Sequence, residues 1–273
     1  MSNLPSIRVA AIQLQSQDDL LSNLADCEHW ISEAAANGAQ FIVLPENFAY
    51  FGPNRGKFAE SLSGSAGPIR ETLVRCATKF GVTVLAGGWP EQGCEPTRPY
   101  NSASVFAPNG QCLANYKKIH LFDVKLPSGE CLRESSAMSA GDEIVCCDVL
   151  GFRVGLSICY DVRFPELYRK LVDRGSEVIC IPSAFTFETG KDHWHLLLRS
   201  RAVESQCWVI GANQCGSHPS GKTTFGHSLI IDPWGNICAE AGPGPGVIIA
   251  DIDRKSIERI RTSLPSLRHR RIA

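Results

Sequence analysis

One cysteine of this chain lies where a nucleophile is expected. Cys159 follows the apolar, strand-like run 153–158 and precedes a polar turn and a segment that reads as a helix from Pro165. A strand-to-helix turn exposes a side chain above a rigid sheet and places backbone N–H groups nearby, which favours negative charge and lowers a thiol pKa. The alternative is a small buried hydrophobe, because the chain has 12 cysteines and free cysteine is usually inert.

A carboxylate in a second segment is a candidate partner for that thiol. Glu46 comes directly after Pro45, at the end of the apolar run 41–44. A carboxylate at the end of a buried strand is costly unless something uses it, and a general base for the thiol is one such use. A helix N-cap or turn carboxylate is the other interpretation.

Two adjacent lysines end the strand-like run 112–118. Side chains of successive strand residues point to opposite faces, so either Lys117 or Lys118 can line a cleft while the other is solvated. An ammonium in such a cleft would neutralise a developing oxyanion. The residues alone favour a solvated charge for each lysine, a packing role for His120, and an ordinary loop carboxylate at Glu134.

Composition and cysteine spacing exclude several function classes. The formal net charge of -1 gives no basic stripe for nucleic acid or an anionic membrane. None of the cysteines forms a C-x-x-C pair, and His193 and His195, two apart on a predicted helix, point to different faces. We therefore expect no metal site and no cofactor.

Length and hydropathy place the chain among ordinary globular proteins. It has 273 residues, of which 44% are hydrophobic and 20% charged, enough for a sizeable core. No apolar run reaches the roughly 18 residues of a membrane span, and the N-terminus lacks the regions of a signal peptide. We expect one domain, residues 1–273, and a cytoplasmic protein.

The two halves of the sequence repeat each other in the same order. Residues 8–13 resemble 153–158, residues 38–48 resemble 175–185, and residues 82–88 match 207–213. A Pro-x-Gly turn between β-rich runs follows in each half, at 107–110 and at 232–235, which indicates a hairpin. Glu46 and Ser183 occupy matching positions in this repeat.

Helical patterns separate these strands and fix the fold class. Apolar residues at helical spacing predict helices over about 20–35, 69–80, 165–174 and 192–204. Each half is then β-α-β-α-β followed by a hairpin. If each half forms a sheet with helices on one face, the bare faces cover each other. We predict an α/β fold: a four-layer α-β-β-α sandwich with an internal pseudo-twofold repeat.

Three motifs, in this order, resemble the nitrilase-superfamily carbon–nitrogen hydrolases and, within them, the Nit-type branch. They are Leu-Pro-Glu at Glu46, Lys-Lys-Ile-His-Leu at Lys118, and Cys-Tyr-Asp-x-Arg-Phe-Pro-Glu at Cys159. The resemblance covers nearly the whole chain, from Arg8 to Arg271, and implies the same αββα fold. It implies a Glu-Lys-Cys triad, selects Lys118 over Lys117, and gives Glu134 a structural or catalytic role.

The resemblance also implies a mechanism without metal or organic cofactor. Glu46 takes the thiol proton, Cys159 attacks an amide carbonyl, and Lys118 with the Tyr160 backbone N–H holds the oxyanion. A thioester follows and is hydrolysed by water. In the resembling proteins the arginine that matches Arg163 binds an α-keto-acid carboxylate. The resemblance therefore implies that Arg163 binds the substrate carboxylate and that Phe185 and Thr189 line the pocket.

The substrate expected from the resemblance is deaminated glutathione, cleaved to 2-oxoglutarate and Cys-Gly. The alternatives are ω-amidase action on 2-oxoglutaramate and nitrilase or carbamoylase chemistry, which use the same triad. A catalytically silent scaffold is the interpretation from a different class. Arg163 could instead form a structural ion pair with Asp161 or Glu166. We expect a small-molecule amide substrate. We also expect a homodimer or higher homo-oligomer that pairs through helices near the site.

Overall fold

Two six-stranded sheets form the centre of the molecule. The computed structural model describes residues 5–53, 58, 67–93, 98–126 and 128–272. The strand order of the first sheet is β16 (Gly246–Asp253), β1 (Ser6–Gln13), β2 (Phe41–Val43), β3 (Thr83–Glu91), β4 (Tyr100–Phe106), β5 (Cys112–Lys117). That of the second is β15 (Ile237–Glu240), β14 (Leu229–Ile231), β11 (Trp208–Gly211), β10 (Val178–Cys180), β9 (Phe152–Leu156), β8 (Cys146–Val149).

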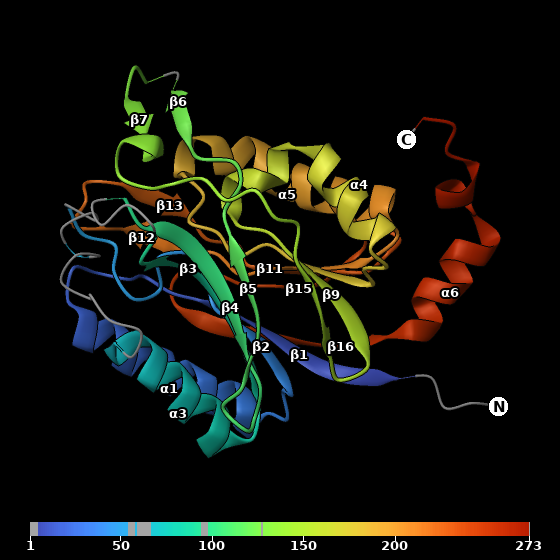
Figure 1. Cartoon of the computed structure of the whole chain (residues 1–273), viewed down its shortest axis with the longest axis horizontal. Helices are drawn as coiled ribbons and strands as arrows, with labels where there is room; N and C mark the ends of the chain where they lie inside the picture. Colours follow the sequence, from blue (N-terminus) through green and yellow to red (C-terminus); the bar gives the residue numbers. More distant parts are fainter. Residues whose placement is uncertain (1–4, 54–57, 59–66, 94–97, 127, 273) are drawn as a thin grey trace.

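Helices cover the outer face of each sheet, which makes four layers (Figure 1). The first sheet carries α1 (Leu20–Ala36) and α3 (Pro68–Phe80), and the second carries α4 (Pro165–Asp173) and α5 (Phe187–Ser205). Helix α6 (Arg254–Ser263) and the 3-10 turn η3 (Ser266–His269) follow β16. The predicted α-β-β-α sandwich is therefore confirmed. Within the described ranges, no helix is long and apolar enough to cross a membrane.

The predicted repeat appears as matching strand orders. The two sheets have the same strand order when each is followed from one edge to the other: β16-β1-β2-β3-β4-β5 in the first sheet matches β8-β9-β10-β11-β14-β15 in the second. In each sheet the three βαβ strands are parallel and the edge strands are antiparallel. The hairpin turns at 107–110 and 232–235 join β4 to β5 and β14 to β15, as the Pro-x-Gly patterns predict.

Both faces of the first sheet are buried, which explains its nearly continuous apolar strands. Along β1, Val9 and Ala11 point into the core shared with the second sheet, whereas Ala10 and Ile12 pack against α1 and α3. This is the period-two alternation of a strand with a core on each side. Each fully buried side chain of Val or Ile size contributes about 1.5–3 kcal/mol relative to exposure.

The structure differs from the sequence prediction in the connections. Glu134, which the residues alone place in an ordinary loop, follows a hairpin, β6 (Asp123–Lys125) with β7 (Cys131–Arg133), and begins the 3-10 turn η1 (Glu134–Ser136). A second hairpin, β12 (Cys215–Ser217) with β13 (Thr223–Phe225), is inserted between β11 and β14. Helix α5 begins five residues before the predicted start, so that Thr189 lies in its first turn.

Candidate active site

Cys159 lies at the start of a tight turn between β9 and α4. The 3-10 turn η2 (Cys159–Arg163) begins there, and Cys159 itself has a left-handed φ of 49°. Its N–H donates to the Pro182 carbonyl at 2.9 Å, which ties the turn to the end of β10. A non-glycine residue in this conformation is strained by about 1–3 kcal/mol, and such strain concentrates at functional sites.

The thiol of Cys159 is held in its neutral form, contrary to the sequence expectation of a lowered pKa. Burial raises the pKa of Cys159 well above its ordinary value, and the Glu46 charge raises it further. Lys118 and the Ala184 backbone N–H act in the opposite direction without reversing the shift. The turn supplies too little positive potential to outweigh burial. A base must therefore take the thiol proton during attack.

Glu46 reaches the thiol from the end of the neighbouring sheet. It is 3% exposed, and its Oε2 accepts a hydrogen bond from the Ala184 N–H at 3.0 Å. Strand β3 makes room for it with a bulge, because a Cβ on Gly88 (φ 56°) would lie 2.4 Å from the Glu46 Cγ. Ser183 is the repeat counterpart of Glu46, and Ala184 is the residue after it. The hydrogen bond from Ala184 to Glu46 therefore crosses the interface between the two sheets.

Lys118 joins two carboxylates in the interior. Its side chain is 2% exposed, and Nζ lies 2.9 Å from Glu46 Oε1 and 2.8 Å from Glu134 Oε2. Burial alone would lower the pKa of Lys118, but the charges of Glu134 and Glu46 outweigh it and raise the pKa. Lys117 is exposed and lies over the Tyr100 ring instead. The structure therefore places Lys118, not Lys117, in the interior cluster.

A buried amide completes this cluster and was missed by the sequence analysis. Asn101 Nδ2 donates to Glu46 Oε1 at 2.8 Å and to Glu134 Oε1 at 3.0 Å. The Phe122 N–H donates to Glu134 Oε2 at 2.8 Å. Glu134 stands at the start of η1, so the unforeseen β6–β7 hairpin carries it to the cluster. Asn101 lies on β4 together with two serines, and nothing in the sequence marks it as a site residue.

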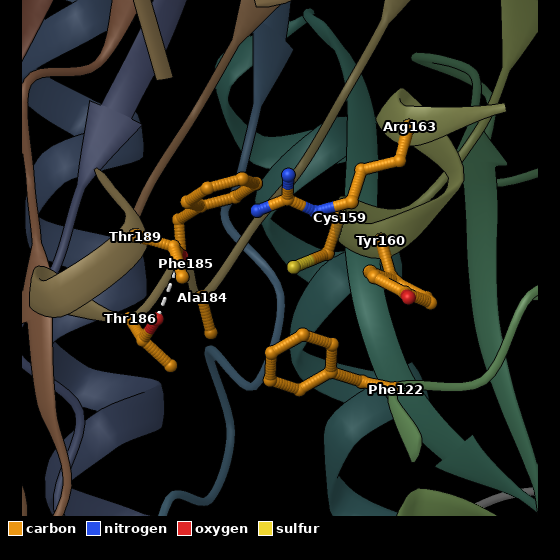
Figure 2. Close-up of a pocket in the computed structure, with 8 residues that line it drawn as sticks. All are labelled: Phe122, Cys159, Tyr160, Arg163, Ala184, Phe185, Thr186 and Thr189. Atoms are coloured by element: carbon orange, nitrogen blue, oxygen red, sulfur yellow. Dashed lines mark hydrogen bonds between the residues drawn. The ribbon is translucent and has the colours of Figure 1, made fainter. Parts of the chain in front are cut away.

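The thiol faces a pocket between the turn after β9 and the start of α5. Figure 2 shows the Cys159 sulfur pointing into it, with the Arg163 guanidinium above and the Phe122 ring on the other side. The lining includes the three predicted substrate residues and five others: Phe122, Cys159, Tyr160, Arg163, Ala184, Phe185, Thr186, Thr189. The Thr186 and Thr189 hydroxyls are hydrogen-bonded at 2.8 Å.

Arg163 faces this pocket, and within the described residues no carboxylate pairs with it. Its guanidinium contacts His193 Nδ1 at 3.4 Å and lies 5.3 Å from the Phe185 ring centroid. The alternative ion pair with Asp161 or Glu166 is not formed: the Asp161 carboxylate accepts hydrogen bonds from other groups, and Glu166 is exposed on α4. Burial lowers the pKa of Arg163. A half-buried, always charged guanidinium is a ready site for an anion.

Asp161 connects two segments of the site by hydrogen bonds. Its Oδ2 accepts from the Tyr116 hydroxyl at 2.7 Å and the Ile158 N–H at 2.8 Å, and its Oδ1 from the His120 N–H at 3.0 Å. The His120 ring lies 2.8 Å from the same oxygen and stacks on Phe164, which is the packing role expected of it. Asp161 thereby joins the segment around Lys118 to the turn that presents Cys159.

These findings define the class of the protein. The chain belongs to the carbon–nitrogen hydrolase family, whose model matches residues 8–262. It is an enzyme of the type that the three motifs indicated, and its cysteine, lysine and glutamates are gathered at the strand ends of the sandwich.

Its relatives lie in the Nit branch. The chain is 46% identical over 265 residues to the deaminated glutathione amidase of Synechocystis, covering 96% of this chain and 97% of that one. It is 36% identical to the human omega-amidase NIT2, covering 98% and 96% of the two chains. The solved structure of Saccharomyces cerevisiae Nit3, of branch 10 of the nitrilase superfamily, superposes with a TM-score of 0.86 at 32% identity, over 98% of this chain and 97% of that one.

Proposed function

We propose that this protein is a cysteine-dependent amidase that cleaves the amide of an α-keto-acid substrate through a thioester. The observation that carries the proposal is the buried Lys118 ammonium held between Glu46 and Glu134 beside the neutral Cys159 thiol. A base, a fixed positive charge and a nucleophile in one water-poor place are what amide cleavage needs.

In the first half-reaction, Glu46 takes the thiol proton as the Cys159 sulfur forms a bond to the amide carbon. The carbonyl oxygen becomes negative and is stabilised by Lys118 and by the Tyr160 N–H, which is among the first N–H groups of η2 and has no acceptor within that turn. The C–N bond then breaks, and the protonated Glu46 gives its proton to the leaving amine. The product is a thioester on Cys159.

In the second half-reaction, Glu46 removes a proton from water, and the water oxygen adds to the thioester carbon. The intermediate collapses, the C–S bond breaks, and the sulfur receives the proton from Glu46. The carboxylic acid leaves and the resting site is restored. In this scheme Glu134 fixes Lys118 by its 2.8 Å ion pair and touches no substrate atom.

Arg163, Phe185 and Thr189 are the proposed substrate-binding residues. Arg163 offers a fork of N–H donors above the sulfur, which suits the carboxylate at the keto end of a 2-oxoglutaryl group.

We favour deaminated glutathione as substrate, with 2-oxoglutarate and Cys-Gly as products. The support is the 46% identity to the Synechocystis deaminated glutathione amidase. The second candidate is ω-amidase action on 2-oxoglutaramate, supported by the human relative. A panel of both amides, a simple nitrile and an N-carbamoyl acid, compared by kcat/KM, decides between them. Highest kcat/KM on a nitrile or carbamoyl acid would contradict the proposal.

The nucleophile is tested by Cys159→Ala. We expect no turnover and no acyl adduct in intact-mass spectra of quenched reactions, with an unchanged fold by circular dichroism. The exposed Cys131 supplies the matched control, since Cys131→Ala should keep full activity. Turnover by the Cys159 variant would end the thioester mechanism.

The acyl-group specificity is tested by Arg163→Lys, because a point ammonium cannot reproduce the planar fork. We expect kcat/KM for deaminated glutathione and 2-oxoglutaramate to fall together by roughly 2–5 kcal/mol in free energy. Uncharged amides should change little. Equal losses on charged and uncharged amides, or a collapse of Tm, would instead make Arg163 a structural residue.

We also propose that residues 1–273 form one domain that pairs into a homodimer in the cytoplasm. Strands from both halves share one core, and the cysteines in the described part of the chain are free thiols, as a reducing compartment favours. On and beside α5, Leu196, Val203 and Trp234 are 65%, 48% and 55% exposed, and such patches mark interfaces. Val203→Glu should shift the sedimentation mass from dimer to monomer, whereas Leu21→Glu on α1 should not.

A further inference from the structure

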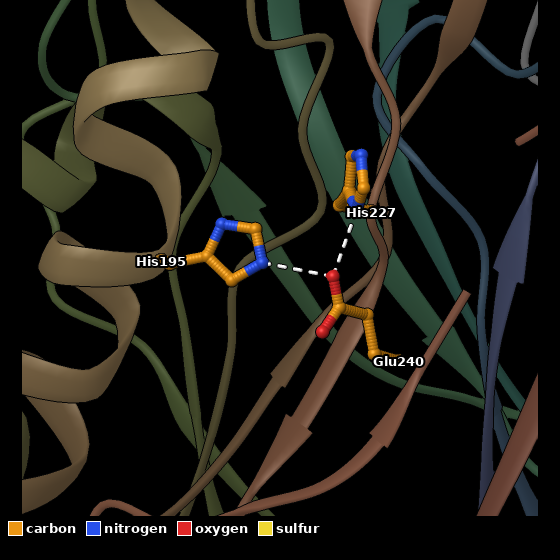
Figure 3. Close-up of side chains that lie close together, drawn as sticks. All are labelled: His195, His227 and Glu240. Carbon is orange, nitrogen blue, oxygen red and sulfur yellow. Dashed lines mark hydrogen bonds and ion pairs between the residues drawn. The ribbon is translucent and has the colours of Figure 1, made fainter. Parts of the chain in front are cut away.

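Three side chains that the amidase mechanism does not use converge on one point beside α5. They are His195 on α5, His227 just before β14, and Glu240 at the end of β15 (Figure 3). His195 Nε2 lies 2.9 Å from Glu240 Oε1, and His227 Nδ1 lies 2.7 Å from the same oxygen. All three are between 35% and 39% exposed, so solvent ions can reach them.

The donor atoms of this cluster are those that a borderline divalent ion takes. The two ring nitrogens and a carboxylate oxygen all lie within 4.8 Å of one another. Zinc binds imidazole nitrogen at about 2.0–2.1 Å and carboxylate oxygen at about 2.0–2.2 Å, which puts tetrahedral donors about 3.3 Å apart. Half-exposed side chains reach that spacing from the present one by small rotations.

The backbone and the packing limit how far two of the three donors can move. His227 has a left-handed φ of 53°, and its carbonyl accepts a hydrogen bond from the buried Trp194 indole at 2.6 Å. The His227 ring stacks on Phe225 at 4.5 Å, and the edge of the His195 ring meets the same phenyl at 6.0 Å. Backbone strain of this kind persists only where the surrounding structure fixes the conformation.

We propose that His195, His227 and Glu240 bind one divalent transition-metal ion of the zinc class, with water completing a tetrahedral shell. The ion would clip α5 to the β14–β15 hairpin and take no part in catalysis at Cys159. Two imidazoles and one carboxylate favour Zn²⁺, Co²⁺ or Ni²⁺ over Mg²⁺ and Ca²⁺, which prefer all-oxygen sites. In the sequence, the histidine nearest to His195 is His193, which turns to Arg163 instead. The second imidazole of the cluster comes from beyond β13.

Metal binding replaces the present hydrogen bonds of the cluster. Zinc bonds to the lone pair of a neutral imidazole nitrogen, so the proton of an N–H that faces Glu240 moves to the other nitrogen of the same ring, and Glu240 changes from a hydrogen-bond acceptor to a metal ligand.

The test is titration of ZnCl₂ into the full-length protein after removal of metals with EDTA. We expect one Zn²⁺ per chain and a rise in Tm. His195→Ala and Glu240→Gln should weaken the affinity at least about tenfold, since loss of an outer-shell partner alone costs that much. His29→Ala, an exposed histidine on α1, is the matched control and should bind as the unmodified chain does.

Thiols are the competing ligands, and Cys238 lies on β15 two residues before Glu240 with its side chain exposed. Cobalt distinguishes them, because a thiolate ligand gives an intense charge-transfer absorption that an N₂O site lacks. We expect Co²⁺ to bind without that absorption, and equally in Cys238→Ser. Absence of zinc binding, unchanged affinity in His195→Ala and Glu240→Gln, or a thiolate absorption lost in Cys238→Ser would overturn the proposal. Amidase activity should survive EDTA, so failure here leaves the proposed function untouched.

Discussion

Lys118 is a charge buried where little water can screen it, and both neighbouring carboxylates depend on it. With its side chain 2% exposed and two ion pairs below 3 Å, it balances part of the negative charge of Glu46 and Glu134. Removing one partner of a buried pair leaves an uncompensated charge, which costs about 3–5 kcal/mol. The same ammonium lies beside the carbonyl oxygen in the proposed mechanism, so stability and catalysis share this residue.

Lys118→Ala should therefore lower both the stability of the fold and the rate of catalysis, whereas Lys117→Ala should lower neither. We expect kcat to fall by about two to three orders of magnitude, as for loss of an oxyanion donor, and urea unfolding to show a loss of about 3–5 kcal/mol. Lys117 has an exposed cation–π contact with Tyr100, worth about 0.5–1 kcal/mol.

The double variant Lys118→Met/Glu134→Gln separates the two effects. It removes one positive and one negative charge together, so stability should return toward that of the unmodified chain while kcat stays low. Recovery of kcat as well would show that Lys118 only balances charge.

At the residue scale, the sequence predicts those site residues that follow an apolar strand or occupy a matching position in the repeat. It does not predict site residues that lack such a local pattern. Cys159 and Glu46 each follow an apolar strand, and matching positions in the repeat drew attention to Glu46. Asn101 and Asp161 act through contacts with residues 33 to 55 positions away, and no spacing rule announces them. Arg163 was correctly placed near the nucleophile, but its neighbours His193 and Phe185 come from another part of the chain.

At the scale of elements, the site depends on how the end of β5 meets the turn after β9. The buried Asp161 carboxylate makes that connection through four hydrogen bonds to Tyr116, Ile158 and His120. Lys118 lies between two of these residues in sequence. A change at Asp161 should thus move Lys118 relative to Cys159 without touching either.

Asp161→Asn tests this connection. The Ile158 and His120 N–H groups donate to different carboxylate oxygens, and asparagine keeps only one of these oxygens. One N–H group therefore loses its acceptor, so about 1–3 kcal/mol of stability should be lost. A shift near 1 Å at the reacting groups can cost about 10²-fold in kcat. Tyr116→Phe removes a single hydrogen bond and is the milder control. If Asp161→Asn lowers Tm but leaves kcat and its pH profile unchanged, Asp161 has only a structural role.

The start of α5 shows why a helix boundary was misplaced. Helical spacing in the sequence begins only at Trp194, which predicts a helix from about residue 192. In the structure Gly190 lies inside the helix because α5 packs closely against β13: a Cβ there would lie 2.3 Å from the Phe225 Cβ. Tertiary packing, rather than helix propensity, selected the glycine.

At the scale of the whole molecule, the sheets and the pseudo-twofold order were predictable because the repeat appears in the sequence. The edge strands β8 and β16 were not, since each pairs antiparallel with a strand by contacts that no repeat or turn motif indicates. The shared core also buries thiols that take no part in the site. Burial raises the pKa of both Cys147 and Cys207 to about 12.

These buried thiols should make the fold sensitive to alkali. An unfolded thiol ionises near pH 8.5 while the folded one stays protonated, so stability is present below that pH and is lost as pH rises toward 12. Each thiol should remove about 1.4 kcal/mol by pH 9.5. Urea unfolding in reductant between pH 7 and 10 measures this decline.

Cys147→Ala is the control for that experiment. The variant should be less stable at neutral pH, because it leaves a cavity, but its decline above pH 8.5 should be shallower by one ionising group. Parallel curves for the two proteins would show that Cys147 does not contribute.

The pairing of β16 with β1 has a consequence for the order of events during synthesis. All eight residues of β1, from Ser6 to Gln13, are matched with Asp253 to Gly246. Roughly 230 residues must be made between the two strands, which takes about 10–50 s at the usual rate of translation. Until then β1 presents an open edge of unpaired backbone groups to other nascent chains. Ribosome pausing before residue 246 should therefore expose the chain to aggregation at its very first strand.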